Sequence, residues 1–158
     1  MKLEFEEVGG RVSRGGEDWV LLNLESFKAL LLGVWEVFSS GAYTILLFAG
    51  QRMGGRLVEY LREKGLEGEE ALARGLAGFL TETGWGRFEV EFREPLTFKV
   101  YDFALYRDAG RGKWKHCALI KGIISGFFSA LWGKVSCLET QCILEGDECC
   151  EFKVQRKG

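Results

Sequence analysis

The chain has 158 residues, a length typical of one domain that buries its own core. Hydrophobic residues make up 47%, charged residues 28%, and proline occurs once, which excludes a disordered or fibrous protein. The net charge is −2 with both signs interspersed, so the sequence lacks the basic footprint of a nucleic-acid-binding protein. We therefore expect a single domain over residues 1–158 that has no nucleic-acid partner.

The first 16 residues are rich in charge and hold four glycines, which predicts a loosely attached lead-in. A signal peptide would need an apolar segment there. No apolar run elsewhere approaches the roughly 18 residues of a membrane-spanning helix. These observations predict a cytoplasmic protein without a membrane span.

Residues 18–24, "DWVLLNL", read as a strand. Apolar residues then recur at spacings of three and four over 24–39, which predicts an amphipathic helix that ends before Gly41. The segment 41–65 also has an apolar stripe, but it contains Gly50, Gly54 and Gly55. These glycines indicate either a close approach to a ligand or another helix, or a break between two shorter helices.

A further helix is predicted over 68–84, followed by two alternating segments, 85–92 and 96–105, that predict an antiparallel hairpin. The basic loop 107–115 lacks the spacing of a phosphate-binding motif and is interpreted as a connection. A helix over about 114–131 and two strands complete the chain. This order predicts an α+β fold, with an antiparallel sheet of about four or five strands covered mainly on one face by about four helices.

Four of the five cysteines lie in the last two predicted strands, within residues 137–150. In a reducing compartment such a cluster indicates a metal site or reactive thiols rather than disulfides. A three-residue loop of Glu145 to Asp147 would place Cys142 opposite Cys150, whereas a two-residue Gly-Asp turn would place Cys142 opposite Glu151. Alternation of side chains favours Cys150 over Cys149 as the inward thiol.

Glu139 lies three residues before Cys142, and such residues face opposite sides of a regular strand. A bulge or a strand end would be needed for both to bind one metal ion. The remaining cysteine, Cys117, begins the helix that leads into these strands, which makes it a further candidate ligand.

The segment "HCALIKGIISGFFSALWGKVSCLETQCILEGDECCEF" resembles the 4-vinyl-reductase domain family. The family pattern is a cysteine, a glycine-spaced helix, Glu-x-x-Cys, a Gly-Asp turn and Cys-x-Phe. The resemblance is strongest over residues 96–155, and "GAYTILLFAGQRMGG" resembles a glycine-containing helix of the same proteins. The matching residues are Cys117, Glu139, Cys142, Gly146, Asp147, Cys150 and Phe152.

This resemblance implies the fold of the TRAPP vesicle-tethering subunits and of the sensing domain of phenol- and toluene-responsive regulators. In those sensors the matching residues hold a zinc ion, which assigns Cys117, Glu139, Cys142 and Cys150 as zinc ligands here. Four protein ligands leave no open position, so the zinc would be structural. The part of the domain that bears the metal would be residues 96–155.

Aromatic residues fit either a core or the lining of a pocket for an apolar ligand. The single histidine, His116, has no predicted orienting partner, which indicates a helix-start residue beside the ligands rather than a general base. No catalytic or organic-cofactor-binding residue is assigned. The candidate pocket residues are Trp85, Phe103, Phe127, Phe128 and Trp132.

We therefore expect a zinc-stabilised sensor or carrier domain for an apolar or aromatic small molecule, without chemistry of its own. The alternative is an assembly module that acts through a homodimer or a partner interface, motivated by the apolar residues from Ile45 to Phe48. A regulatory partner protein is expected for the sensor, because the sequence contains no output part. A tetrapyrrole vinyl reductase ranks last, because no dinucleotide fingerprint and no iron–sulfur cysteine spacing are present.

Overall fold

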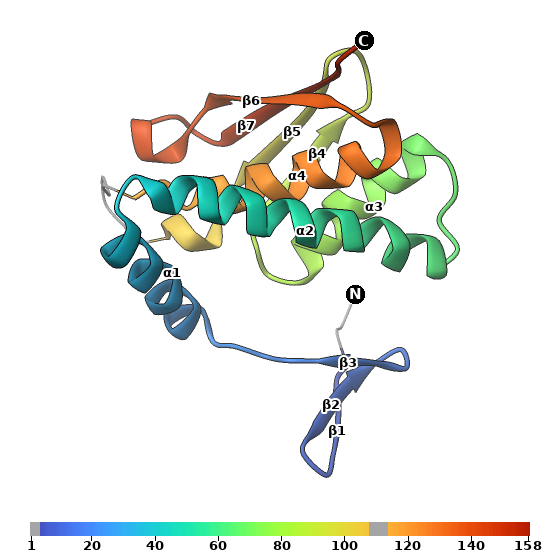
Figure 1. The fold of residues 1–158 in the computed structure, drawn as a ribbon. Helices are drawn as coiled ribbons and strands as arrows, with labels where there is room; N and C mark the ends of the chain where they lie inside the picture. Colours follow the sequence, from blue (N-terminus) through green and yellow to red (C-terminus); the bar gives the residue numbers. More distant parts are fainter. Residues whose placement is uncertain (1–3, 108–113) are drawn as a thin grey trace.

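The computed structural model describes residues 4–107 and 114–158. In these residues two separate antiparallel sheets are combined with four α-helices (Figure 1). The larger sheet has the strand order β4-β5-β7-β6. Its strands are β4 (Arg87–Glu91), β5 (Leu96–Tyr101), β6 (Val135–Gln141) and β7 (Cys150–Arg156). The α+β fold predicted from the order of elements is confirmed.

The N-terminal segment folds into a small three-stranded sheet that the sequence pattern did not predict. Its strands are β1 (Glu6–Val8), β2 (Arg11–Arg14) and β3 (Glu17–Trp19). Two glycine pairs, Gly9–Gly10 and Gly15–Gly16, have positive φ and turn the chain between these strands, a conformation that glycine adopts without a steric penalty. The strand expected over 18–24 therefore ends at Trp19.

The first two helices are α1 (Leu24–Phe38) and α2 (Gly41–Glu63). Asn23 begins α1 by accepting a hydrogen bond from the backbone N–H of Ser26 at 2.8 Å. Because α2 is continuous over 23 residues, the break considered for its glycines is wrong. Gly54 instead lies against α4 (Cys117–Trp132), where an added Cβ would collide with the backbone carbonyl of Ile123. The glycines of α2 thus serve close helix packing.

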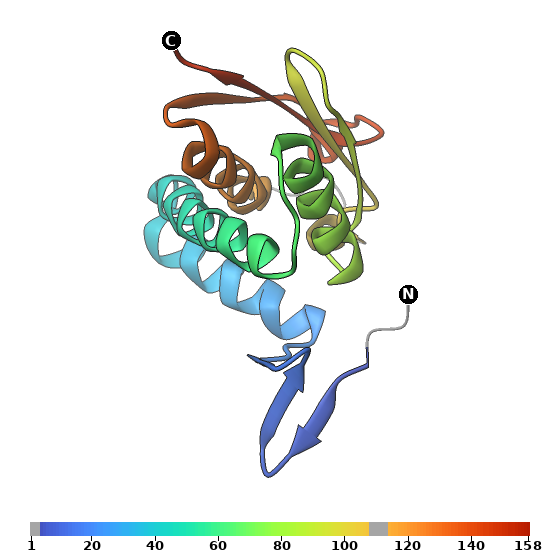
Figure 2. The same ribbon diagram turned by 90° about the vertical axis from the view of Figure 1, so that its right-hand side faces the viewer.

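The helices are stacked below one face of the larger sheet (Figures 1 and 2). α3 (Glu69–Glu82) and α4 lie directly against the strands, α2 packs mainly on α4, and α1 packs on α2. α1 is therefore the outermost helix, next to the N-terminal sheet. The opposite face of the larger sheet carries charged side chains, such as Lys99 and Glu151, which face each other across β5 and β7.

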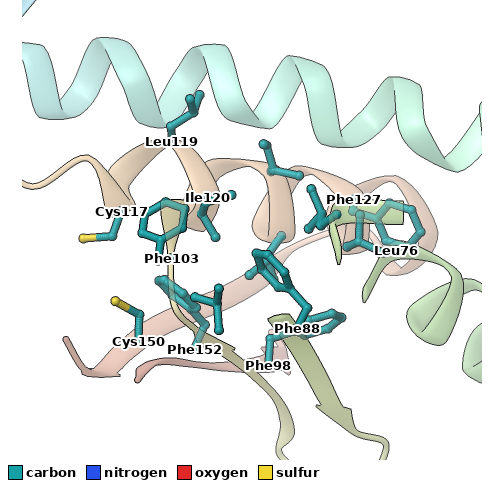
Figure 3. Close-up of a cluster of buried hydrophobic side chains, with 14 of the residues drawn as sticks. Leu76, Phe88, Phe98, Phe103, Cys117, Leu119, Ile120, Phe127, Cys150 and Phe152 are labelled. Atoms are coloured by element: carbon teal, nitrogen blue, oxygen red, sulfur yellow. The ribbon is translucent and has the colours of Figure 1, made fainter. Parts of the chain in front are cut away.

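The core lies between α4 and the larger sheet (Figure 3). The predicted hairpin is confirmed, since β4 pairs with β5 and Val90 is opposite Phe98. The inner face of β7 adds Phe152 and Val154 to the same core. Most of the predicted loop 107–115 lies outside the described residues. No described helix combines the length and the apolar character that crossing a membrane requires.

Candidate metal centre

Helix α4 carries the first candidate ligand at its first residue. The side chain of Cys117 is fully buried and points to the end of the core at which the Cys150 thiol also lies (Figure 3). The backbone N–H of Cys117 donates a hydrogen bond to the hydroxyl of Tyr106 at 2.9 Å. Tyr106 belongs to the short 3₁₀ helix η1 (Ala104–Tyr106), which follows β5. The position of Cys117 is thus set by two neighbouring elements.

A β-bulge in β6 turns the second candidate ligand, Glu139, toward α4. Glu139 pairs with Phe152, but Gln141 pairs with Glu151, so Thr140 is the additional residue. Glu139 and Cys142 can therefore face the same side although they are three residues apart. The bulge that the sequence required for joint ligation is present.

The loop between β6 and β7 orients Cys142. It contains a second 3₁₀ helix, η2 (Ile143–Glu145), and Gly146 in the left-handed conformation at φ 98°. The side chain of Asp147 accepts a hydrogen bond from the backbone N–H of Cys142 at 2.9 Å. Because Gln141 pairs with Glu151, the next residue of this register places Cys142 opposite Cys150. This is the register of the first alternative, although η2 makes the loop longer than a three-residue turn.

Three of the four predicted ligands come together. The donor atoms of Cys117, Glu139 and Cys142 all lie within 4.8 Å of one another, and the Cys117 Sγ is 3.4 Å from Oε1 of Glu139. Cys150 is hydrogen-bonded to Cys142 but lies outside this compact group. Its Sγ accepts a hydrogen bond from the N–H of Ile143 at 3.4 Å.

The donor set suits zinc. Thiolates are the preferred soft ligands of this ion, and a carboxylate commonly completes its tetrahedral shell. With bonds of about 2.0–2.3 Å, the donors of a tetrahedral zinc site are separated by roughly 3.5 Å. The compact group is close to this spacing. His116 is not part of it, because its Nδ1 accepts a hydrogen bond from the indole N–H of Trp35 at 3.2 Å.

The surroundings keep the thiols protonated when no cation is bound. The hydrogen bond with Cys142, burial and the charge of Glu139 together raise the pKa of the Cys117 thiol well above its ordinary value. Burial likewise raises the pKa of Cys150. Lys115 is the nearest compensating charge, since its pKa is raised by a hydrogen bond with Glu145 at 3.1 Å and also by Glu139 and Cys117. Binding of a cation would release the thiol protons.

The other two cysteines lie outside this group. Cys149 is buried on the opposite side of β7, where its thiol donates a hydrogen bond to Oε1 of Gln141 at 3.3 Å. Cys137 lies further along β6, opposite Val154, and burial raises its pKa to about 12. Its nearest charged group on α4 is Lys121. The preference for Cys150 over Cys149 agrees with this placement.

The five predicted pocket residues do not line one cavity. Phe103 lies beside Cys117, but Phe127 is ten residues further along α4, about 15 Å at the helical rise (Figure 3). Phe128 and Trp132 stack near the C-terminal end of α4, and Trp85 packs against Phe27 of α1. The predicted pocket residues are thus divided between the two ends of the core and α1.

A ring cluster beside Cys117 was not predicted from the sequence. Trp35 stacks on Trp114 at 5.2 Å between ring centroids, and Tyr106 packs against Phe103 at 5.1 Å and His116 at 6.2 Å. We call these five residues the ring cluster. The apolar spacing of α1 identified Trp35 as a core residue, but nothing in the sequence indicated its contact with residues about 80 positions away.

Two hollows at the surface of the described residues are polar. One, of about 650 Å³, lies beside the N-terminal sheet and is lined by residues such as Glu4, Glu6 and Arg14. The other, of about 360 Å³, lies on the charged face of the larger sheet, near Glu91 and Lys153. Neither is lined by the ring cluster or by a predicted metal ligand.

Comparisons with known proteins agree with this architecture. Three solved structures share the fold. The phenol-responsive sensory domain of the transcription activator PoxR, solved with phenol, is 18% identical with a TM-score of 0.76, covering 95% of this chain and 83% of that one. A trafficking protein particle complex subunit 3 from Naegleria fowleri, covalently bound to palmitic acid, is 18% identical with a TM-score of 0.67, covering 85% and 93%.

The third, a vinyl-4-reductase family protein from Methanocaldococcus jannaschii, is 17% identical with a TM-score of 0.62, covering 89% of this chain and 85% of that one. No curated protein matches the sequence significantly. The family model of the 4-vinyl-reductase domain matches residues 96–156, which span β5 to β7 and include all four predicted ligands. The resemblance stated from the cysteine and glutamate pattern is confirmed, and the chain carries a 4-vinyl-reductase domain in its C-terminal part.

Proposed function

We propose that this protein is a small-molecule sensor domain in which a structural zinc ion ties α4 to the β6–β7 hairpin. The observation that carries the metal site is the buried group of Cys117, Glu139 and Cys142, with donor atoms within 4.8 Å of one another. The sensor role is supported by the match to the 4-vinyl-reductase domain and by the fold of a phenol-responsive sensory domain.

Zinc would be held by Cys117, Glu139, Cys142 and Cys150. A closed shell requires the Cys150 thiol to move toward the compact group, which its hydrogen-bonded neighbour Cys142 already joins. With four protein ligands the ion would act as a cross-link between elements and would have no position for a reacting water. The proposed role is therefore stability and not catalysis.

The ligand would be a small apolar or aromatic molecule bound at the ring cluster. This location is supported by the rings that gather beside Cys117 and by the loose attachment of α1, the outermost helix, which supplies Trp35. Side chains fill the ring cluster, so entry of a ligand would require α1 to shift relative to Trp114. Such a shift would change the outer surface of α1, which offers a route to a regulatory partner protein.

The metal is tested by elemental analysis of protein purified without added metal. We expect about one zinc per chain, and a melting temperature that falls when a strong chelator removes it. Protein that contains no zinc and does not gain stability when zinc is added would contradict the metal site.

The ligand is tested by thermal shift and tryptophan fluorescence of the zinc-loaded protein. Phenol represents small aromatic ligands, and palmitic acid represents long acyl ligands. We expect stabilisation by phenol that saturates with concentration, together with a change in fluorescence because two tryptophans belong to the ring cluster. No response to phenol would contradict the aromatic ligand, and a response to palmitic acid alone would assign an acyl ligand instead.

Assembly is a second candidate function, because apolar side chains are exposed in one part of the chain. Of the twelve large apolar residues that are exposed among the described residues, all but Val8 and Leu138 lie between residues 20 and 53. They come from the segment before α1, from α1 itself and from α2. We call them the exposed apolar group: Val20, Leu21, Leu22, Leu30, Leu32, Val37, Phe38, Ile45, Phe48 and Met53.

Exposed apolar residues in this number mark interaction surfaces of soluble proteins. We propose a homodimer formed through α1 and α2. Light scattering after size-exclusion chromatography measures the mass directly. A monomer over the whole concentration range would contradict the dimer, without affecting the metal site.

A further inference from the structure

The hydroxyl group of Tyr106 makes two hydrogen bonds to one residue, the candidate ligand Cys117. It accepts the backbone N–H of Cys117 at 2.9 Å, and it also hydrogen-bonds the Cys117 side chain. An amide N–H can only donate, so the hydroxyl proton remains for the sulfur. The N-terminal N–H groups of a helix have no partner within the helix, and His116 supplies no side-chain cap to α4. Tyr106 thus replaces the missing cap at the residue that carries the thiol.

The place of this hydroxyl is set by packing. Tyr106 is 7% exposed, and its ring lies between Phe103 and His116. His116 is held in turn by the indole N–H of Trp35. Burial raises the pKa of Tyr106 far above its ordinary value, so the hydroxyl keeps its proton at any pH at which the protein is folded. A donor that is rigid and always protonated suits a permanent contact with a charged sulfur.

From this geometry we infer that Tyr106 is a positioning residue of the metal centre, which directs the Cys117 sulfur toward Glu139 and Cys142 and stabilises its thiolate form. The inference rests on the proposed zinc site and goes beyond its four ligands. Outer hydrogen-bond partners of metal ligands commonly change metal affinity by about 10–100-fold. A donor to the thiolate also withdraws electron density from the sulfur, which alters the sulfur-to-metal absorption of a coloured ion bound in its place.

The test is Tyr106→Phe, which keeps the ring and removes only the hydroxyl. The matched control is Tyr101→Phe, because Tyr101 lies on β5 only five residues away but stacks on Arg87. Zinc affinity is measured by competition with a chromophoric chelator, and the thiolate bonds are measured by the absorption of bound Co²⁺. We expect about 10-fold weaker zinc binding and a shifted sulfur-to-cobalt band for Tyr106→Phe, and wild-type values for Tyr101→Phe.

A purely structural role would lower the melting temperature of the metal-free protein and leave the zinc affinity and the cobalt band unchanged. That result would overturn the inference while the zinc site stands. A wild-type protein that binds neither Zn²⁺ nor Co²⁺ would overturn the zinc site and, with it, the role of Tyr106.

If Tyr106→Phe does not fold, a chain with Tyr43, Tyr60 and Tyr101 replaced by Phe retains Tyr106 as its single tyrosine. Labelled with 3-fluorotyrosine, it reports the hydroxyl environment by ¹⁹F NMR. We expect the resonance to shift when one equivalent of zinc is added. An unchanged resonance in protein that has bound zinc would overturn the inference.

Discussion

The two halves of the molecule place polar and apolar groups in opposite ways. In the 4-vinyl-reductase part, residues 96–156, α4 and the β6–β7 hairpin bury thiols and turn a carboxylate toward them, with Cys117 and Cys150 0% exposed. In the N-terminal part, the exposed apolar group leaves large hydrophobic side chains in solvent, such as Val20 at 86% and Phe48 at 62%.

Each arrangement is costly for the isolated chain. Buried polar groups need a partner that replaces water, and a contiguous apolar surface in water favours association. The 4-vinyl-reductase part therefore points to a small cation inside the protein, and the N-terminal part points to a macromolecular surface outside it. α2 joins the two parts, since its inner side packs on α4 and its outer side carries Ile45, Phe48 and Met53.

The largest effect is expected for the thiols of the 4-vinyl-reductase part. Cys142→Ser or Cys150→Ser should abolish zinc binding and lower the melting temperature by about 10 °C, as a loss of about 4 kcal/mol does in a domain of this size. Cys149→Ser and Cys137→Ser should retain the zinc, because both thiols lie outside the compact group. Elemental analysis and calorimetry measure the two effects. Zinc retained in Cys150→Ser but lost in Cys149→Ser would contradict the assigned register.

The junction between the two parts is tested at neighbouring glycines of α2. Gly54→Ala should cost about 1–3 kcal/mol, because its Cβ would meet the backbone of α4 and force the helices apart. Gly55→Ala has open space and should stabilise the helix by up to about 1 kcal/mol. Chemical denaturation measures both variants. Equal stabilities would show that the contact between α2 and α4 is not tight.

The exposed apolar group is tested by a charge in its centre. Phe48→Glu should weaken a dimer by about 2 kcal/mol, or roughly 30-fold in the dissociation constant, because the carboxylate would be buried without a partner. Glu63→Gln, at the other end of α2, serves as the control. Analytical ultracentrifugation gives the constants. Should both variants match the wild type, the dimer would not use the outer side of α2.

The smallest effect concerns the contact between Trp35 and His116, through which α1 reaches the start of α4. Burial, and then the charge of Lys28, lower the pKa of His116 below its ordinary value of about 6.5. A lowered pKa means that the folded state binds fewer protons, so this contribution is present above about pH 6.5 and is lost as the pH falls through the folded value.

Metal-free protein should therefore lose part of its stability between about pH 6.5 and 5, by about 1 kcal/mol or less. His116→Gln should remove this part of the pH dependence. The free energy of unfolding, measured with chelator present over that range, distinguishes the two proteins. An identical pH profile for both would mean that His116 does not contribute.

The local pattern determined much of the fold. The spacing of apolar residues located all four helices and the β4–β5 hairpin, since these elements depend on which side of a short segment is apolar. It also identified the four candidate ligands, because a thiol and carboxylate pattern is visible without any knowledge of packing. It did not reveal β1 and β2, whose glycine pairs serve equally well as turns or as flexible linkers.

Contacts between distant segments were decided only by the tertiary structure. Gly54 packs against α4 because two helices meet there, and a single helix pattern cannot distinguish that contact from a break. The extra residue Thr140 in β6 exists only relative to its partner strand, so the orientation of Glu139 could be stated only as a condition. Tyr106 and Trp35 reach Cys117 and His116 from other elements, and the exposure of α1 depends on which helix lies outermost. Spacing along the chain records the periodicity of one element, whereas a binding site is made where several elements meet.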